Sequence, residues 1–180
     1  LTRGMAFDTQ PRVSPDGQTI AFVSDRSGAE NLWLMPINGK GEARQLSHGE
    51  DTVFVSPEWA PDGSGIVASR TGVIRNRLME LLLYPLDGSA PLSLVNGTRE
   101  GITAVGAAFG ADTQKVYVAQ KPKSQQNYYP QIGQYQIAVL DRASGELSQL
   151  GAGFESTWLQ FAKFDPSGTR VAYLYRNDIY

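Results

Sequence analysis

The side chains able to do chemistry are few in this chain. Its 180 residues include one histidine, His48, and no cysteine. Zinc sites use thiolate and imidazole ligands, and a Ser-His-Asp triad needs its histidine, so His48 alone could serve either kind of site. It stands in the polar run Ser47-His48-Gly49-Glu50-Asp51, and three adjacent ligands rarely make a metal site by themselves. We therefore expect a solvated loop histidine, no catalytic residue, no cofactor and no metal site, so that this chain alone is not an enzyme.

Signatures of other chemistries do not occur in the sequence. It has no G-x-S-x-G nucleophile elbow, phosphate-binding loop or dinucleotide fingerprint. With 19% charged residues, a net charge of −2 and a pI near 5.4, it offers no electrostatic attraction to nucleic acid or to an anionic membrane. No apolar run approaches the ~20 residues that span a bilayer, and no signal peptide is visible. We expect no nucleic-acid partner and no membrane span.

A repeated unit organises the whole chain. Each copy is built around a turn of the Ser-Pro-Asp-Gly type, and the last turn positions, Gly17, Gly63, Thr113 and Gly168, are 46, 50 and 55 residues apart. Repeats near this length that contain several short strands are typical of β-propeller blades. The copies read Pro11-Arg12-Val13-Ser14-Pro15-Asp16-Gly17, Pro57-Glu58-Trp59-Ala60-Pro61-Asp62-Gly63, Ala107-Ala108-Phe109-Gly110-Ala111-Asp112-Thr113 and Ala162-Lys163-Phe164-Asp165-Pro166-Ser167-Gly168.

The residues of the turn explain why it recurs. Proline sets φ for the second position of a tight turn, aspartate is tolerated next, and glycine takes the left-handed conformation that closes the hairpin. The third copy places Thr113 where the others have glycine. Because a β-branched residue resists positive φ, this turn should be distorted or of another type.

A strand-forming run that is apolar on both faces follows each turn. In the first run Ile20 and Phe22 point one way, while Ala21 and Val23 point the other. Strands buried on both faces read in this way, as they must when blades stack against neighbouring blades. The runs are 19–24, 65–69, 115–119 and 170–175, followed by third-strand segments at 31–39, 80–88 and 136–141 and by short fourth strands at 43–46, 91–94 and 147–150.

These patterns predict an all-β fold, a β-propeller of four-stranded antiparallel blades. Residues 1–180 would form one partial propeller of about three and a half blades: blade one near 9–47, blade two near 55–95, blade three near 104–150 and a partial blade four near 158–180. Propellers usually close with four to eight blades, so we interpret the chain as a fragment of a larger propeller. The alternative is a closed four-bladed ring in which residues 1–4 complete the last blade.

The longer connections gather on one face of the expected disc. They are 47–56, 95–106 and 151–157 between blades and 121–134 inside blade three, whereas the turns of the other face are tight. Insertions on one face mark a candidate binding face, here a basic and aromatic rim for an acidic peptide, a carbohydrate or a partner domain. The alternative is a solvated insertion without a ligand. The candidate residues are Arg70, Arg75, Arg77, Lys121, Lys123, Tyr128 and Tyr129.

The repeat resembles a known family. The segments Gln10-Pro11-Arg12-Val13-Ser14-Pro15-Asp16-Gly17 and Asn31-Leu32-Trp33-Leu34-Met35 look like the TolB-type, WD-like propeller repeat, and nearly the whole chain is covered, with blade three the weakest match. Such propellers occur in TolB, in tricorn-like and prolyl-oligopeptidase-type peptidases, and ahead of exported bacterial amidohydrolases. The run from Leu1 to Pro11, together with Ser56-Pro57-Glu58-Trp59 and Gln136-Ile137-Ala138-Val139-Leu140-Asp141, looks most like the amidohydrolase-linked group.

The resemblance implies three functions for the chain. The first is a non-catalytic scaffold or substrate gate for the catalytic domain of an exported amidohydrolase, whose metal-binding histidine motifs do not occur here. The second is a TolB-like protein-interaction propeller of a periplasmic envelope complex, and the third is the gating propeller of a serine peptidase. Expected partners are the missing blades, that catalytic domain, and further copies of the chain that associate through open propeller ends. A periplasmic or extracellular location follows from the resemblance alone.

Overall fold

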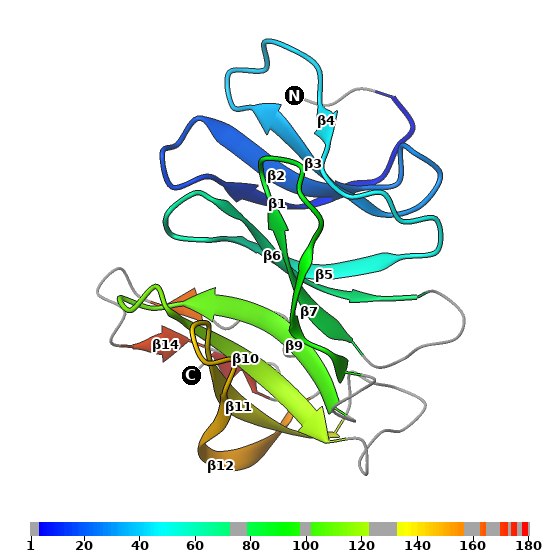
Figure 1. The fold of residues 1–180 in the computed structure, drawn as a ribbon. Helices are drawn as coiled ribbons and strands as arrows, with labels where there is room; N and C mark the ends of the chain where they lie inside the picture. Colours follow the sequence, from blue (N-terminus) through cyan, green and yellow to red (C-terminus); the bar gives the residue numbers. More distant parts are fainter. Residues whose placement is uncertain are drawn as a thin grey trace.

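The computed structural model describes residues 4–72, 79–97, 102–122, 133–156, 163–164, 170–172, 174–175 and 178–179 (Figure 1). These residues are nearly all β-structure, in three four-stranded antiparallel sheets and two short strand pairs. No helix in this part of the chain has the length and apolar character needed to cross a membrane.

Each of the three sheets takes its four strands in sequence order. Sheet one contains β1 (Asp8–Val13), β2 (Thr19–Ser24), β3 (Asn31–Pro36) and β4 (Arg44–Gln45). Sheet two contains β5 (Val53–Trp59), β6 (Gly65–Thr71), β7 (Glu80–Pro85) and β8 (Leu92–Val95), and sheet three contains β9 (Ile102–Phe109), β10 (Lys115–Pro122), β11 (Gly133–Asp141) and β12 (Leu147–Ser156). The two pairs are β13 (Lys163–Phe164) with β14 (Val171–Ala172) and β15 (Leu174–Tyr175) with β16 (Asp178–Ile179).

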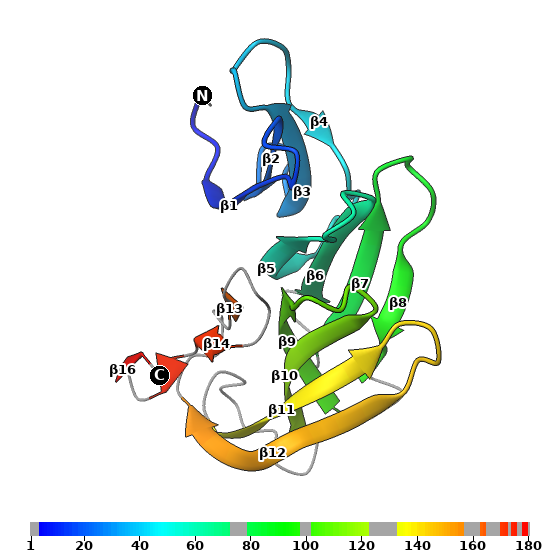
Figure 2. The same cartoon turned by 90° about the vertical axis from the view of Figure 1, so that its left-hand side faces the viewer.

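The sheets are arranged as a fan. Figure 2 shows the first strand of each sheet on the inner side of the fan and the fourth strand on the outer side. Strand β1 contacts β5, β5 contacts β9, and β9 contacts β13. Consecutive sheets therefore stack face to face around a common inner edge, which is the order expected for propeller blades.

Sheet two is covered on both faces by apolar side chains. On one face Ile66 and Ala68 pack with Ala21 and Val23 of sheet one. On the other, Val67 of the same strand belongs to a cluster with the buried residues of sheet three. This double burial confirms the expectation drawn from the continuous apolar runs, since alternate residues of one strand point to opposite faces.

The repeated turns close as the sequence predicts. Gly17 has φ 71° and its amide donates to the Ser14 carbonyl at 2.9 Å, while the Asp16 carboxylate accepts hydrogen bonds from the Ser14 hydroxyl at 2.5 Å and the Gln18 amide at 3.0 Å. Gly63 has φ 72° and its amide donates to the Ala60 carbonyl at 2.8 Å, while the Asp62 carboxylate accepts from the amide and hydroxyl of Ser64. Thr113 is not among the described residues with positive φ. The third turn is therefore of another type, as expected for threonine.

Each inner strand carries a bulge that the sequence analysis did not foresee. The register of β1 against β2 shifts between Thr9 and Arg12, and β5 and β9 show the same irregularity at the matching place. The residue at the bulge is left-handed in all three strands: Gln10 (φ 53°), Ser56 (φ 51°) and Gly106 (φ 70°). A bulge bends its strand and increases the local twist, here at the same point of each repeat.

All four long connections are shorter than the sequence suggested, since β5 begins at Val53 inside 47–56 and β9 begins at Ile102 inside 95–106. Residues 151–156, expected between blades, continue β12 to Ser156. The expected connection 121–134 is reduced by β10, which ends at Pro122, and by β11, which begins at Gly133. Antiparallel pairing explains the difference, because Gly133 pairs with Ser156 and extends the sheet beyond the apolar runs.

Candidate functional site

Two of the seven candidate binding residues lie in the described part of the chain. Arg70 stands near the end of β6, beside the connection 72–79, with its side chain 35% exposed. Its Nη2 lies 3.2 Å from Glu80 Oε2 on the paired strand β7. The remaining candidates, Arg75, Arg77, Lys123, Tyr128 and Tyr129, lie outside the described residues, so the rim as a whole stays a prediction.

Lys121 has a different environment from the one its position in a long insertion suggested. Its side chain is fully buried, and its Nζ lies 5.8 Å from the centre of the Tyr135 ring. Around that ring pack Val55, Met79 and Ala119. Burial lowers the pKa of Lys121 and raises the pKa of Tyr135 to about 12. Lys121 is therefore buried beside Tyr135 and does not offer an exposed ammonium group.

His48 lies in a connection that is held by a buried asparagine. Asn31, which is 1% exposed, accepts hydrogen bonds from the Ser47 hydroxyl at 2.9 Å and the Gly49 amide at 2.7 Å, and it donates to the Gly49 carbonyl at 3.0 Å. A fully paired buried amide of this kind fixes the backbone on both sides of His48. In the sequence this contact is signalled by one amide residue, Asn31, at the start of an otherwise apolar strand. The sequence analysis did not predict it.

Metal ligands do not gather around His48 or elsewhere in the described residues. In that part of the chain no group of three histidine, cysteine, aspartate or glutamate side chains is close enough together to hold an ion.

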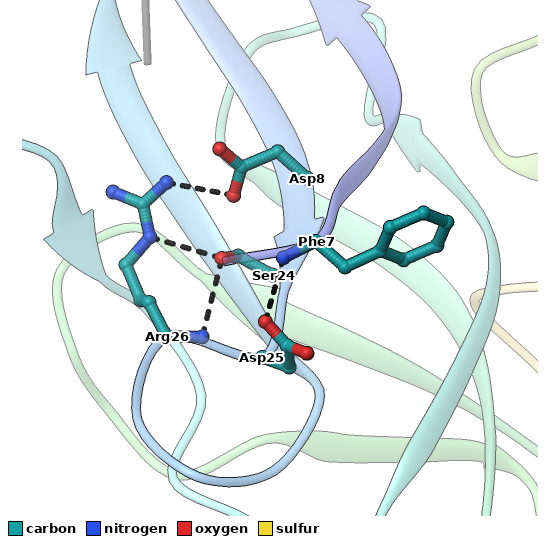
Figure 3. Close-up of polar contacts among 5 residues, drawn as sticks. All are labelled: Phe7, Asp8, Ser24, Asp25 and Arg26. Atoms are coloured by element: carbon teal, nitrogen blue, oxygen red, sulfur yellow. Dashed lines mark hydrogen bonds and ion pairs between the residues drawn. The ribbon is translucent and has the colours of Figure 1, made fainter. Parts of the chain in front are cut away.

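A cluster of polar residues surrounds Arg26 (Figure 3). It lies on the face of sheet one that carries Phe22 and Trp33, opposite the face that packs on sheet two. The Arg26 guanidinium contacts Asp8 Oδ1 at 2.7 Å and Ser24 Oγ at 2.9 Å. Its central carbon lies 4.9 Å from the Phe22 ring centre and 5.0 Å from the Trp33 ring centre. Arginine over aromatic rings is a stabilising arrangement, and here Nη2 also donates to the carboxylate and Nε to the hydroxyl.

The face that Arg26 covers is apolar and is turned away from sheet two. Phe22 and Trp33 pair across β2 and β3, whereas their neighbours Ala21 and Leu34 point into the core between the sheets. Val13, at the edge of this face, is 54% exposed. Phe22 itself is buried, and the Arg26 guanidinium lies over its ring.

The chain is similar in sequence to parts of longer known proteins. No family model matches the chain. It is 46% identical over 69 residues to the uncharacterized peptidase YuxL of Bacillus subtilis, which covers 38% of this chain and 10% of that protein. It is 32% identical over 97 residues to the TolB homolog of Chlorobaculum tepidum, covering 54% of this chain and 21% of that protein. The chain therefore spans at most about a fifth of the length of these relatives.

Among solved structures, TolB from Acinetobacter baumannii superposes on 92% of this chain and 37% of its own, with a TM-score of 0.68 and 21% identity. The fold is a β-propeller. Sheets one, two and three are its blades, and the bulged strands β1, β5 and β9 are the inner strands of those blades. The described part of the propeller brings His48 and Arg70 to one cleft between blades one and two, which Leu46 and Pro91 also line.

Proposed function

We propose that this chain is a non-catalytic segment of a propeller that serves as scaffold or substrate gate for the catalytic domain of an exported hydrolase. The observation that carries the proposal is the stacking of complete four-stranded blades around one inner edge. A stack of this kind builds a ring, and the ring can admit a substrate through its axis or carry a second domain on one face. The chain brings one histidine and no cysteine to any chemistry.

The class of hydrolase rests on two arguments that point in different directions. The sequence resembles the propellers that precede bacterial amidohydrolases, whose catalytic barrel binds metal. The relative with the higher identity over its matched segment is named as a peptidase. That relative favours a peptidase parent, in which the propeller would restrict entry to peptides, and leaves the amidohydrolase as the rival proposal.

A TolB-like interaction propeller is the second candidate function. It is supported by the match to a TolB homolog and by the superposition on TolB over most of the chain. In this case the propeller would bind partner proteins of the bacterial envelope and no catalytic domain would be attached. Both candidate functions place the chain in the periplasm or outside the cell.

Two measurements test the proposal together. The first is the coding sequence that follows Tyr180 in the parent gene. A nucleophile elbow with later aspartate and histidine supports the peptidase, His-x-His ligands support the amidohydrolase, and an end soon after the propeller supports the TolB-like function. The second is an assay of the purified chain alone against short peptide and amide substrates. Turnover that survives further purification would contradict a non-catalytic role.

A further inference from the structure

Two asparagine–glycine pairs occur in the chain, and the structure gives them different surroundings. Asn38-Gly39 lies in the connection between β3 and β4, where both residues are exposed. Figure 2 shows this connection projecting from sheet one, away from sheets two and three. Asn96-Gly97 directly follows β8, where Asn96 is half-buried and Gly97 is buried. The same chemistry can therefore be compared at an exposed and at a covered position of one chain.

An asparagine that precedes glycine carries its own reaction partner. The backbone nitrogen of Gly39 can attack Cγ of the Asn38 amide, because glycine has no side chain that blocks the approach. As the new N–Cγ bond forms, the C–N bond of the side-chain amide breaks, and its nitrogen takes the proton of the Gly39 amide and leaves as ammonia. Water then opens the cyclic imide at one of its two carbonyl carbons, which gives aspartate or isoaspartate.

The turn that contains Asn38 activates its side-chain carbonyl. The Lys40 amide donates a hydrogen bond to Asn38 Oδ1 at 2.9 Å. A backbone N–H at this oxygen polarises the carbonyl group and stabilises the negative charge that develops there while the nitrogen attacks, as the donors of an oxyanion hole do. The turn thus makes Cγ of Asn38 a better electrophile.

One hydrogen bond of the same turn opposes the reaction. The Gly39 amide donates to the Pro36 carbonyl at 3.0 Å, so its nitrogen can attack only when this bond opens. The bond lies in an exposed turn beyond the end of β3, and such bonds open at a lower free-energy cost than those of buried strands. The reaction should therefore be slower in the folded than in the unfolded chain, but it should proceed in both.

Aspartate is already the residue of the equivalent turn in blade two. Asp87 stands there before a left-handed glycine, and its Oδ1 accepts the Ser89 amide at 2.9 Å, as Asn38 Oδ1 accepts the Lys40 amide. Hydrogen bonds from Ser89 lower the pKa of Asp87, which means that the turn favours the carboxylate. An aspartate formed at position 38 fits its turn in the same way, whereas isoaspartate would add a methylene group to the backbone.

We propose that Asn38 is a site of spontaneous deamidation in the folded protein and that Asn96 is not. The reaction consumes only water, releases ammonia and places a new negative charge in the turn between β3 and β4. The inference stands apart from the proposed function, because it needs only this turn of blade one.

Peptide mapping by mass spectrometry measures conversion of both asparagines to acid in one sample. In the folded chain Asn38 should convert at least ten-fold faster than Asn96, and faster at about pH 9 than at about pH 7, because the Gly39 nitrogen attacks after it loses its proton. In guanidinium chloride the two rates should agree within about two-fold, since each asparagine precedes glycine. Conversion of Asn38 no faster than that of Asn96 in the folded chain, or a similar difference in the unfolded chain, would overturn the proposal.

Two variants separate the chemistry from a change in stability. Asn38→Gln lengthens the side chain by one methylene group, so the attack would have to close a larger ring, and conversion at this position should fall ten-fold or more. Asn38→Asp reproduces the product and should melt within about 2 °C of wild type, as the turn of Asp87 indicates. Equal conversion in Asn38→Gln would refute the assigned chemistry, and a much lower melting temperature of Asn38→Asp would contradict a product that fits the turn.

Discussion

Gln10 and Ser56 hold the same left-handed backbone conformation in successive inner strands, and a hydrogen bond joins them. The Ser56 amide donates to Gln10 Oε1 at 2.7 Å, and Gln10 Nε2 donates to the Phe54 carbonyl at 3.1 Å. The side-chain amide of Gln10 in blade one thus makes the hydrogen bonds that a neighbouring strand would otherwise make to the bulge of blade two. Proline follows both residues, and the residue before proline prefers an extended backbone, so the strained conformation must be held by these contacts.

Gln10→Ala should destabilise the protein by about 1–3 kcal/mol, because it leaves two backbone groups without their partners at a strained position. Urea unfolding of the variant and of wild type measures the difference. Gln18→Ala, in an exposed turn, serves as the control and should change stability by less than about 0.5 kcal/mol. A loss no greater for Gln10→Ala than for Gln18→Ala would show that the bridge between blades is not stabilising.

Gly17→Thr should destabilise the protein by roughly 1–2 kcal/mol, because the residue needs positive φ. A Cβ at this position meets no atom within 4 Å, so the cost would be conformational and not steric. Thr113→Gly should bring no gain, since Thr113 is not left-handed and glycine only loosens the unfolded chain. Thermal unfolding checks both variants, and a higher melting temperature for Thr113→Gly would contradict the observed turn.

Acid should destabilise the protein through its turn aspartates. Hydrogen bonds from the Ser14 hydroxyl and the Gln18 amide lower the pKa of Asp16, and bonds from Ser64 do the same for the pKa of Asp62. A carboxyl group whose pKa is lower in the folded than in the unfolded state stabilises the fold above pH ~4, and the contribution disappears as the pH falls through the folded pKa.

Asp16→Asn tests this linkage, because the amide keeps an acceptor oxygen in the turn but has no proton to gain. The melting temperature of the variant should fall less steeply than that of wild type between about pH 5 and pH 2. Superimposable pH profiles would mean that Asp16 does not contribute.

The chain should associate with itself through the exposed face of blade one. Val13 is 54% exposed on the face that carries the Phe22 and Trp33 rings, and exposed apolar side chains of this kind favour contact between molecules. Val13→Asp should shift sedimentation at micromolar concentration toward the monomer. Leu92→Asp, an equally exposed position on blade two, should not. A monomeric wild-type chain would refute the association.

The blades were predictable because their signals are local. Proline, aspartate and glycine define each turn within four residues, and the strand from Thr19 to Ser24 is found where its apolar run predicted it. Contacts between blades were not predictable, because they join residues far apart in the sequence. Gln10 meets Ser56 across 46 residues, and rules for the residue before proline argue for the opposite backbone conformation.

The candidate site was harder to predict than the fold for the same reason. Arg70 was chosen because basic residues follow it in the sequence, yet the structure places it with Phe54 and Tyr84 in a cleft that depends on how two sheets stack. Lys121 was chosen from an insertion and is buried, because strand β10 continues through it to Pro122. Neither a buried tyrosine hydroxyl nor an arginine that lies over an aromatic pair has a local sequence signature.

The central claim, that this propeller segment gates or carries a hydrolase domain, is tested most directly on the parent protein. The rate constants kcat/KM are measured for peptides of increasing length with the intact parent and with a version from which the propeller has been removed. We predict that the intact protein strongly prefers short peptides and that removal of the propeller raises the rate for long ones by ten-fold or more. An unchanged preference for length, in a catalytic domain that still cleaves the short peptides, would contradict the gate.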